Sequence, residues 1–181
     1  MNLSKITDTI YKLTETNGKE HAEVIIFYLF SGIYLSINNI NIHHITGTIS
    51  DPLPDIPMVS NPDIFRINYC FEGRCEIKLK DGRYVYVDNN VLCIESHTPT
   101  YNFYYPLGFY KGIEVHIDKK TVSNNFSGVS SLFGIDLLKL IEQYGNTTET
   151  FIHIASDLFA QKSVEIIAIW EPQTLLKSFH R

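Results

Sequence analysis

The sequence predicts a mainly-β domain, an antiparallel sandwich or small barrel, followed by α-helices at the C-terminal end. Short runs of Val, Ile, Phe and Tyr recur through residues 20–118, separated by Gly, Pro, Asn and Asp, which is the rhythm of such folds. Aromatic residues make up 13% of the chain, and Tyr and Phe favour strands. After Thr121 the apolar residues recur at helical spacing instead.

The composition suits one globular domain without a nucleic-acid-binding stripe. The chain has 181 residues and a net charge of −5, and no run of Lys or Arg exceeds two residues, whereas a protein that grips phosphates normally carries a basic stripe. The first residues lack the basic and apolar regions of a signal peptide. No apolar run approaches the roughly 18 residues that span a bilayer. We therefore expect a cytoplasmic protein that contacts no membrane.

The N-terminal residues 1–18 are predicted to form a helix or arm. Ser4 can cap a helix, and apolar residues at positions 6, 10 and 13 recur at helical spacing, which predicts a short amphipathic helix over 4–16. The pair Asn17-Gly18 is expected to end it.

A β-barrel is predicted for residues 19–122, beginning with about three strands between Glu23 and Ile45. The pairs Ser31-Gly32 and Asn38-Asn39 are expected to separate these strands. Residues 50–63 hold four of the seven prolines, so they are expected to form an irregular loop within the domain.

The clearest strand pattern lies in residues 65–96. Apolar and polar residues alternate from Phe65 to Glu72, and Gly73 is expected to end or bulge that strand. The pair Asp81-Gly82 is a strong hairpin signal, and Asp88-Asn89-Asn90 predicts the next turn. Further strands are expected at 91–96, 101–105 and 109–118.

The C-terminal region 123–181 is predicted to be helical and to serve dimerisation. Helices are expected at 136–144, closed by Gly145, and at 155–170, stopped by Pro172. The segment 150–154 can add a last strand. Trp170 is the expected interface anchor, because aromatic residues dominate interface energetics.

The candidate ligand-binding residues are polar side chains on or beside otherwise apolar strands. They either lie on an outer, half-exposed face or line the interior of the barrel and orient a small polar ligand. Strand parity does not decide between these faces. The set comprises Arg66, Asn68, Glu72, Tyr101, Lys111, Glu114 and His116.

No residue pattern predicts a catalytic site, a metal site or a cofactor. The adjacent His43 and His44 point to opposite faces of a strand, and only Glu114 and His116 share a face, so a barrel-type metal set is missing. No G-x-S-x-G motif occurs. The three cysteines form no C-x-x-C pair, and we expect them to be reduced core residues.

Four segments resemble the regulatory domain of AraC-type transcription regulators, of the kind common in clostridia and other Firmicutes. They are "SGIYLSINNINIHH", "RINYCFEGRCEIKLKDGRYVYVDNNVLCI", "GFYKGIEVHID" and "LFGIDLLKLIEQY", and the resemblance covers roughly residues 20–160. It implies a cupin-like double-stranded β-helix, or jelly-roll barrel, that binds an effector and is followed by dimerisation helices. The final "AIWEPQTLLKSFHR" departs from the family's usual dimerisation helix.

The resemblance also implies partners and contacts. Its effector positions fall on Glu72, Tyr101 and Lys111, and the effector would be a sugar-like or other polar metabolite. In the family, two helix-turn-helix motifs in a C-terminal module contact DNA, and this chain ends at Arg181 before such a module. We therefore expect a homodimer that reaches DNA only through a module absent from this chain.

Two other functions remain open at this point. A metal-dependent cupin enzyme, such as an isomerase or dioxygenase, has the same kind of barrel. A purely structural interaction domain would fill its barrel with its own Phe and Tyr side chains.

Overall fold

The predicted mainly-β class is confirmed by a computed structural model, which describes residues 2–30, 32–43, 63–78, 82–96, 103–125, 137–145 and 150–166. Eight strands follow one another in the sheet in the order β1-β2-β3-β4-β9-β5-β7-β10, and β6 and β8 also pair with β5. Every pairing is antiparallel. The strands are β1 (Asn2–Lys5), β2 (Ile10–Asn17), β3 (Glu20–Phe30), β4 (Ile33–Asn41), β5 (Ile64–Lys78), β6 (Tyr84–Asp88), β7 (Val91–Glu95), β8 (Phe103–Tyr104), β9 (Tyr110–Asp118) and β10 (Thr150–Ile154).

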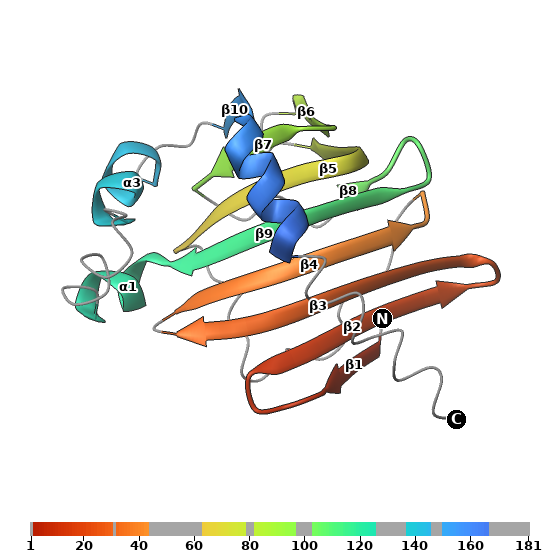
Figure 1. Ribbon diagram of the computed structural model, residues 1–181, viewed down its shortest axis with the longest axis horizontal. Helices are drawn as coiled ribbons and strands as arrows, with labels where there is room; N and C mark the ends of the chain where they lie inside the picture. The colour runs from red at the N-terminus through yellow and green to blue at the C-terminus, as the bar shows by residue number, and fades with distance from the viewer. Residues whose placement is uncertain are drawn as a thin grey trace.

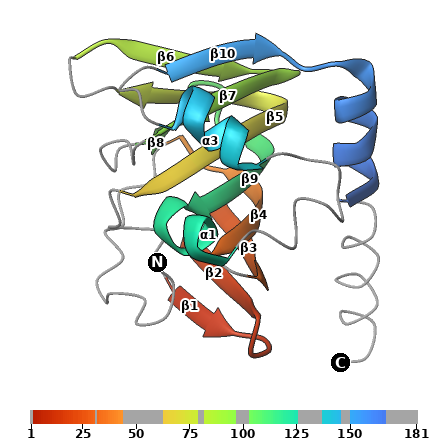
Figure 2. The ribbon, with the colours of Figure 1, turned by 90° about the vertical axis from the view of Figure 1, so that its left-hand side faces the viewer.

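Helices occupy one end and one face of the sheet (Figures 1 and 2). α1 (Lys119–Asn125) and α3 (Leu137–Tyr144) lie together beyond the end of β9, and a helix at 157–166 crosses the sheet in front of β5 and β9. The predicted C-terminal helices and the strand at 150–154 are thus confirmed where the chain is described, whereas Trp170 lies outside the described residues. Within the described part of the chain, no helix has the length and apolar character needed to cross a membrane.

β5 organises the sheet because it pairs with four strands. On one side, its first half pairs with β7 and its second half with β6. On the other side, it pairs with β9 and, at Glu76 and Ile77, with β8. Between Cys70 and Glu72 the register with β9 shifts by one residue, so Phe71 is an extra residue in β5. Such a bulge bends the strand and increases its twist.

The bulge changes which residues of β5 face the barrel interior. Side chains alternate between the two faces of a strand, and an extra residue reverses that alternation. Cys70 faces inward before the bulge, and Cys75 and Ile77 face inward after it, where all three join one buried cluster.

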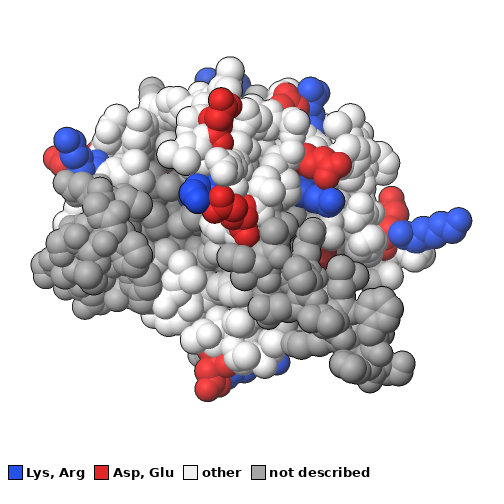
Figure 3. Space-filling view, viewed as in Figure 1, with Lys and Arg blue, Asp and Glu red and all other residues white. Residues whose placement is uncertain are grey.

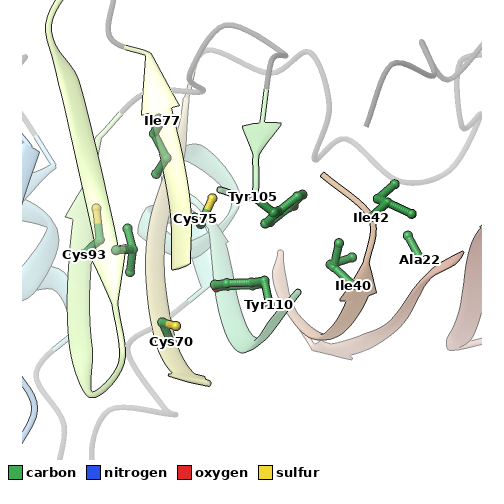
Figure 4. Packing of buried hydrophobic residues seen from close by; sticks show 10 residues of the cluster. Ala22, Ile40, Ile42, Cys70, Cys75, Ile77, Cys93, Tyr105 and Tyr110 are labelled. Carbon is green, nitrogen blue, oxygen red and sulfur yellow. The ribbon is translucent and has the colours of Figure 1, made fainter. Parts of the chain in front are cut away.

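The apolar part of the interior is formed by both halves of the sheet. Figure 4 shows Tyr105 and Tyr110 between β5 on one side and the β3–β4 residues Ile40 and Ala22 on the other. The Tyr105 and Tyr110 rings lie 5.4 Å apart between centroids. A backbone hydrogen bond of 2.8 Å from the Tyr105 amide to the His43 carbonyl ties the segment after β8 to the end of β4.

A second apolar cluster lies on the opposite, outer face and anchors the helices. Phe65 of β5 and Ile117 of β9 are buried there together with Val122 of α1 and Ile141 of α3. The helices therefore cover apolar surface that the sheet would otherwise expose, which is the ordinary driving force for such packing.

The expected N-terminal helix over 4–16 is wrong, because this segment forms β1 and β2. Asn17 pairs with Glu20 in a two-residue hairpin loop, and Gly18 in that loop has φ of 63°. A glycine with positive φ at the first loop position matches the twist of a β-hairpin. The Asn17-Gly18 pair is therefore a hairpin signal, and the tertiary pairing of β2 with β3 outweighs the helical spacing of a few apolar residues.

One expected strand break is also wrong, and one expected turn is confirmed without a chain reversal. Asn38 and Asn39 lie inside the continuous strand β4, where Asn38 is buried on the interior face. The turn expected at Asp88-Asn89-Asn90 is present at Asn89 and Asn90. The chain continues past it in the same direction, because β6 and β7 both pair antiparallel with successive parts of β5. Asn90 has a left-handed φ of 63° in this turn, and its amide donates a hydrogen bond to the Cys70 carbonyl beside the β5 bulge.

The close packing at the β5 bulge generates a stability prediction. A Cβ on Gly73 would lie 2.3 Å from the Phe109 carbonyl oxygen, and its φ is 89°. Gly82 has a similar φ of 86°, but no described atom lies within 4 Å of a Cβ built there. We expect Gly73→Ala to destabilise the protein by roughly 3 kcal/mol, from strain plus overpacking, and Gly82→Ala by only about 1 kcal/mol. Urea unfolding followed by circular dichroism measures both, and equal losses would contradict the packing argument.

Candidate functional site

The structure brings four of the seven candidate residues together on the interior face of the barrel. Asn68 lies opposite Glu114 and Arg66 lies opposite His116 in the pairing of β5 with β9. Residues that face each other across an antiparallel pair share a face of the sheet. These four side chains form what we call the buried polar cluster, together with Glu95 of β7 and Ser36 and Asn38 of β4.

Arg66 is the central charge of this cluster. Arg66 is only 4% exposed, and Glu95, which lies opposite it on β7, is 2% exposed. The guanidinium Nη2 donates a hydrogen bond to Glu95 Oε2, and Nη1 lies 3.9 Å from Glu114 Oε2. Glu114 Oε2 in turn lies 3.0 Å from His116 Nε2.

Burial and charge act in opposite directions on these groups. Burial by itself would raise the pKa of Glu114, but the Arg66 guanidinium, His116 and a hydrogen bond from Asn38 outweigh it and lower that pKa. Burial likewise disfavours the charged form of Arg66, and the Glu95 and Glu114 carboxylates nevertheless raise its pKa. Arg66 and Glu114 are therefore both charged, and each depends on the other for compensation.

Asn68 has an unused hydrogen-bond donor. Tyr110 donates its hydroxyl proton to Asn68 Oδ1 over 2.6 Å. The Asn68 amide nitrogen, Nδ2, is buried and has no hydrogen-bond partner among the described residues. A buried donor without a partner costs about 1–3 kcal/mol, so Nδ2 marks a place where an acceptor would be stabilising.

Glu95 is the important site residue that sequence reasoning missed. It ends the otherwise apolar run of β7, and only the pairing of β7 with β5 shows that it faces Arg66. Its Oε1 atom is buried and accepts no hydrogen bond from the described residues. The pKa of the nearby Cys93 thiol is raised, mainly by burial and secondly by the Glu95 carboxylate. The thiol therefore stays protonated and is at most a weak hydrogen-bond donor.

The other candidate residues lie elsewhere. Lys111 is on the face of β9 opposite to Glu114 and His116, and it pairs with Glu72 over 3.2 Å at the outer surface. These two family-implied contacts are therefore not in the buried polar cluster. Tyr101 lies outside the described residues.

The expected core cysteines are confirmed. Cys70, Cys75 and Cys93 are free and buried. Burial is the main reason why the pKa of Cys70 is raised to about 12 and that of Cys75 lies well above its usual value. Protonated thiols are poor nucleophiles and poor metal ligands. In the described ranges, no three His, Cys, Asp or Glu side chains are grouped so that they could hold a metal ion.

Charged side chains are interspersed on the surface. In the view of Figure 3, Lys and Arg lie next to Asp and Glu and form no continuous basic area on the part of this face that is described. This distribution offers no obvious electrostatic footprint for nucleic acid on that face.

Comparisons with known proteins find only distant structural similarity. No protein-family model matches the sequence, and no curated protein matches it. The solved structures that it resembles are cupin-fold proteins. The EutQ protein of Clostridium difficile has a TM-score of 0.41 and 15% identity, over 61% of this chain and 72% of that chain.

Two further solved structures show the same level of similarity. A putative glyoxylate-induced protein from Pseudomonas aeruginosa has a TM-score of 0.45 and 9% identity, over 84% of this chain and 52% of that one. A variant of oxalate decarboxylase from Bacillus subtilis has a TM-score of 0.37 and 9% identity, over 84% of this chain and 44% of that one. The chain thus spans about half the length of these two proteins, and no residue role is transferred from any of the three.

The pairing of the buried Arg66 charge with the Glu95 and Glu114 carboxylates leads to a second stability prediction. Arg66→Met should destabilise the protein by about 3–5 kcal/mol, because it leaves buried carboxylates without a counter-charge. Arg74→Met is the matched control on the same strand, since its ion pair with Asp88 is roughly half exposed and is worth less than about 1 kcal/mol. In the double variant Arg66→Met/Glu95→Gln, part of the loss should be recovered. Chemical unfolding decides, and similar losses for Arg66→Met and Arg74→Met would refute the role of Arg66.

Proposed function

We propose that the chain is an effector-binding domain, and that it takes up a small polar molecule at the buried polar cluster without transforming it. The observation that carries this proposal is that the cluster contains buried polar atoms without hydrogen-bond partners among the described residues, and Asn68 Nδ2 and Glu95 Oε1 are two of these atoms. Buried polar groups in folded proteins are normally satisfied, so exceptions mark places that a ligand or an ordered water completes.

The arrangement of the cluster supports binding rather than mere packing. Two central strands, β5 and β9, supply the cluster residues Arg66, Asn68, Glu114 and His116, and each of these strands is hydrogen-bonded to other strands on both sides. Such strands hold their side chains more rigidly than loops do, and rigid placement lowers the entropic cost of binding. An interior site built in this way suits recognition of one small molecule.

We further propose that this domain serves an AraC-type transcription regulator. The support is the sequence resemblance over roughly residues 20–160, and the lack of an obvious basic footprint fits a sensory role for this chain. DNA contact in such a regulator would be made by a separate helix-turn-helix module.

The binding proposal predicts a saturable ligand effect. In a thermal-shift panel of sugars, polyols, amino acids, carboxylates and amines, at least one compound should raise Tm, because a ligand that binds only the folded state stabilises it. Asn68→Ala should weaken the binding of that compound by about 5- to 100-fold, because one hydrogen bond to a buried donor is lost. Isothermal titration at a temperature where both proteins are folded measures the change.

The controls separate the alternatives. Asp88→Asn removes a carboxylate from a half-exposed ion pair outside the buried polar cluster and should leave affinity unchanged. Failure of every compound class would favour a structural domain whose barrel is filled by its own side chains. Stoichiometric iron, manganese, nickel or zinc in the purified protein would favour the metal-dependent enzyme instead.

We also propose that the domain forms a homodimer through its C-terminal region. Large apolar side chains are exposed on β10 and on the helix at 157–166, and among the described strands β10 pairs with β7 alone and lies at the edge of the sheet. Ile154 is 84% exposed, Leu158 66% and Val164 56%. Such exposure is typical of an interface.

The dimer predicts a specific effect of charge at this surface. Leu158→Glu/Val164→Glu should weaken self-association at least about tenfold, because charges are costly when buried in an apolar interface. Leu3→Glu, at the opposite edge of the sheet where Leu3 is also exposed, is the control. Sedimentation equilibrium measures both, and a wild-type chain that stays monomeric at every concentration would contradict the proposal.

A further inference from the structure

We infer that the ligand of the buried polar cluster is uncharged and binds through hydroxyl groups, as a polyol or a sugar-like molecule does, and that the site disfavours carboxylates and phosphates although an arginine lies at its centre. This inference rests on the proposed function, because it names the ligand class of the same site. It is carried by the charges around Arg66 and by the hydrogen-bonding character of two atoms.

The described charges around Arg66 leave no positive excess for an anion. Arg66 contributes one positive charge, and Glu95 and Glu114 contribute two negative charges. With neutral His116 the sum is −1, and with protonated His116 it is zero. An anion beside Arg66 would also meet the two carboxylates at short range, and their repulsion would offset the attraction to the guanidinium.

The orientation of the Asn68 amide follows from its neighbour. Tyr110 is fully buried, and burial raises the pKa of its hydroxyl well above the usual value, so the phenol carries its proton. That proton needs an acceptor, and among the described residues Asn68 Oδ1 accepts it at 2.6 Å. Asn68 must therefore present Nδ2, a donor, to whatever completes the site.

A ligand atom at this place has to be a hydrogen-bond acceptor. An ammonium group has donors only, so it would leave Asn68 Nδ2 unsatisfied even though the net charge attracts it. This condition disfavours simple amines at the same place where the charge sum disfavours anions.

Glu95 Oε1 adds the complementary condition, because a carboxylate oxygen needs a donor. Asn68 lies opposite Cys93, two residues before Glu95 on β7, so Asn68 and Glu95 are diagonal neighbours on one face. Such positions are about 7–8 Å apart between backbones, and their side chains can converge on one small molecule. A hydroxyl both accepts and donates, so one hydroxyl, or two neighbouring ones, satisfies Asn68 Nδ2 and Glu95 Oε1.

The test compares carbon skeletons that differ in charge. The wild-type chain is titrated with D-glucitol, D-glucose and ribitol as uncharged probes, with D-gluconate and D-ribonate as anions, and with D-glucosamine as a cation. We expect at least one uncharged probe to bind, and its carboxylate counterpart to bind at least about tenfold more weakly. In Glu95→Gln, which removes one negative charge beside Arg66, the preference for the uncharged partner should fall several-fold. Asp88→Asn, which removes a half-exposed carboxylate outside the cluster, should keep the preference.

Each outcome bears on a different claim. Binding of a carboxylate or of glucosamine in preference to the uncharged probes would overturn the ligand class and leave the binding function standing. No binding by any of the probes would also overturn the ligand class, and the wider panel of the proposed function then decides whether the domain binds a ligand at all. A preference that is the same in Glu95→Gln and in the wild type would show that the cluster does not set the selectivity.

Discussion

The extra residue at Phe71 in β5 is the constraint on which the arrangement of the barrel depends. Before this bulge the even-numbered residues of β5 face the interior, and after it the odd-numbered ones do. The interior is therefore lined by Arg66 and Asn68 at one end and by Cys75 and Ile77 at the other. Without the shift, Arg74 and Glu76 would face the apolar cluster. Gly73 makes the shift possible, because no other residue tolerates both its positive φ and the nearby Phe109 carbonyl.

The bulge divides the interior into an apolar end and a polar end with different energetic roles. The apolar end, around Tyr110 and Ile77, supplies burial and therefore stability. The polar end holds an arginine and two carboxylates, which are expensive to remove from water and do not by themselves stabilise the fold more than apolar residues would. A protein that keeps such a cluster on its central strands retains it for a reason other than packing, and ligand recognition is a reason consistent with its incomplete hydrogen bonding.

Much of the fold was predictable because it follows from local patterns. The alternation in 65–72, the strands at 91–95 and 110–118 and the helices at 137–144 and 157–166 all read directly from residue periodicity. The errors came where one short pattern fits two structures. Asn17-Gly18 ends helices and also closes hairpins, so only the partner strands decide.

The sequence by itself determined that the chain is mainly β with helices at its end, that its cysteines are core residues, and which polar side chains on its strands were worth attention. Only the tertiary structure decided which of these share a face. It joined Arg66, Asn68, Glu114 and His116 with Glu95, and it placed Glu72 and Lys111 on the opposite side of the sheet. The physical reason is that the face of a strand residue depends on register and bulges, which are set by contacts with distant strands rather than by neighbours in the chain.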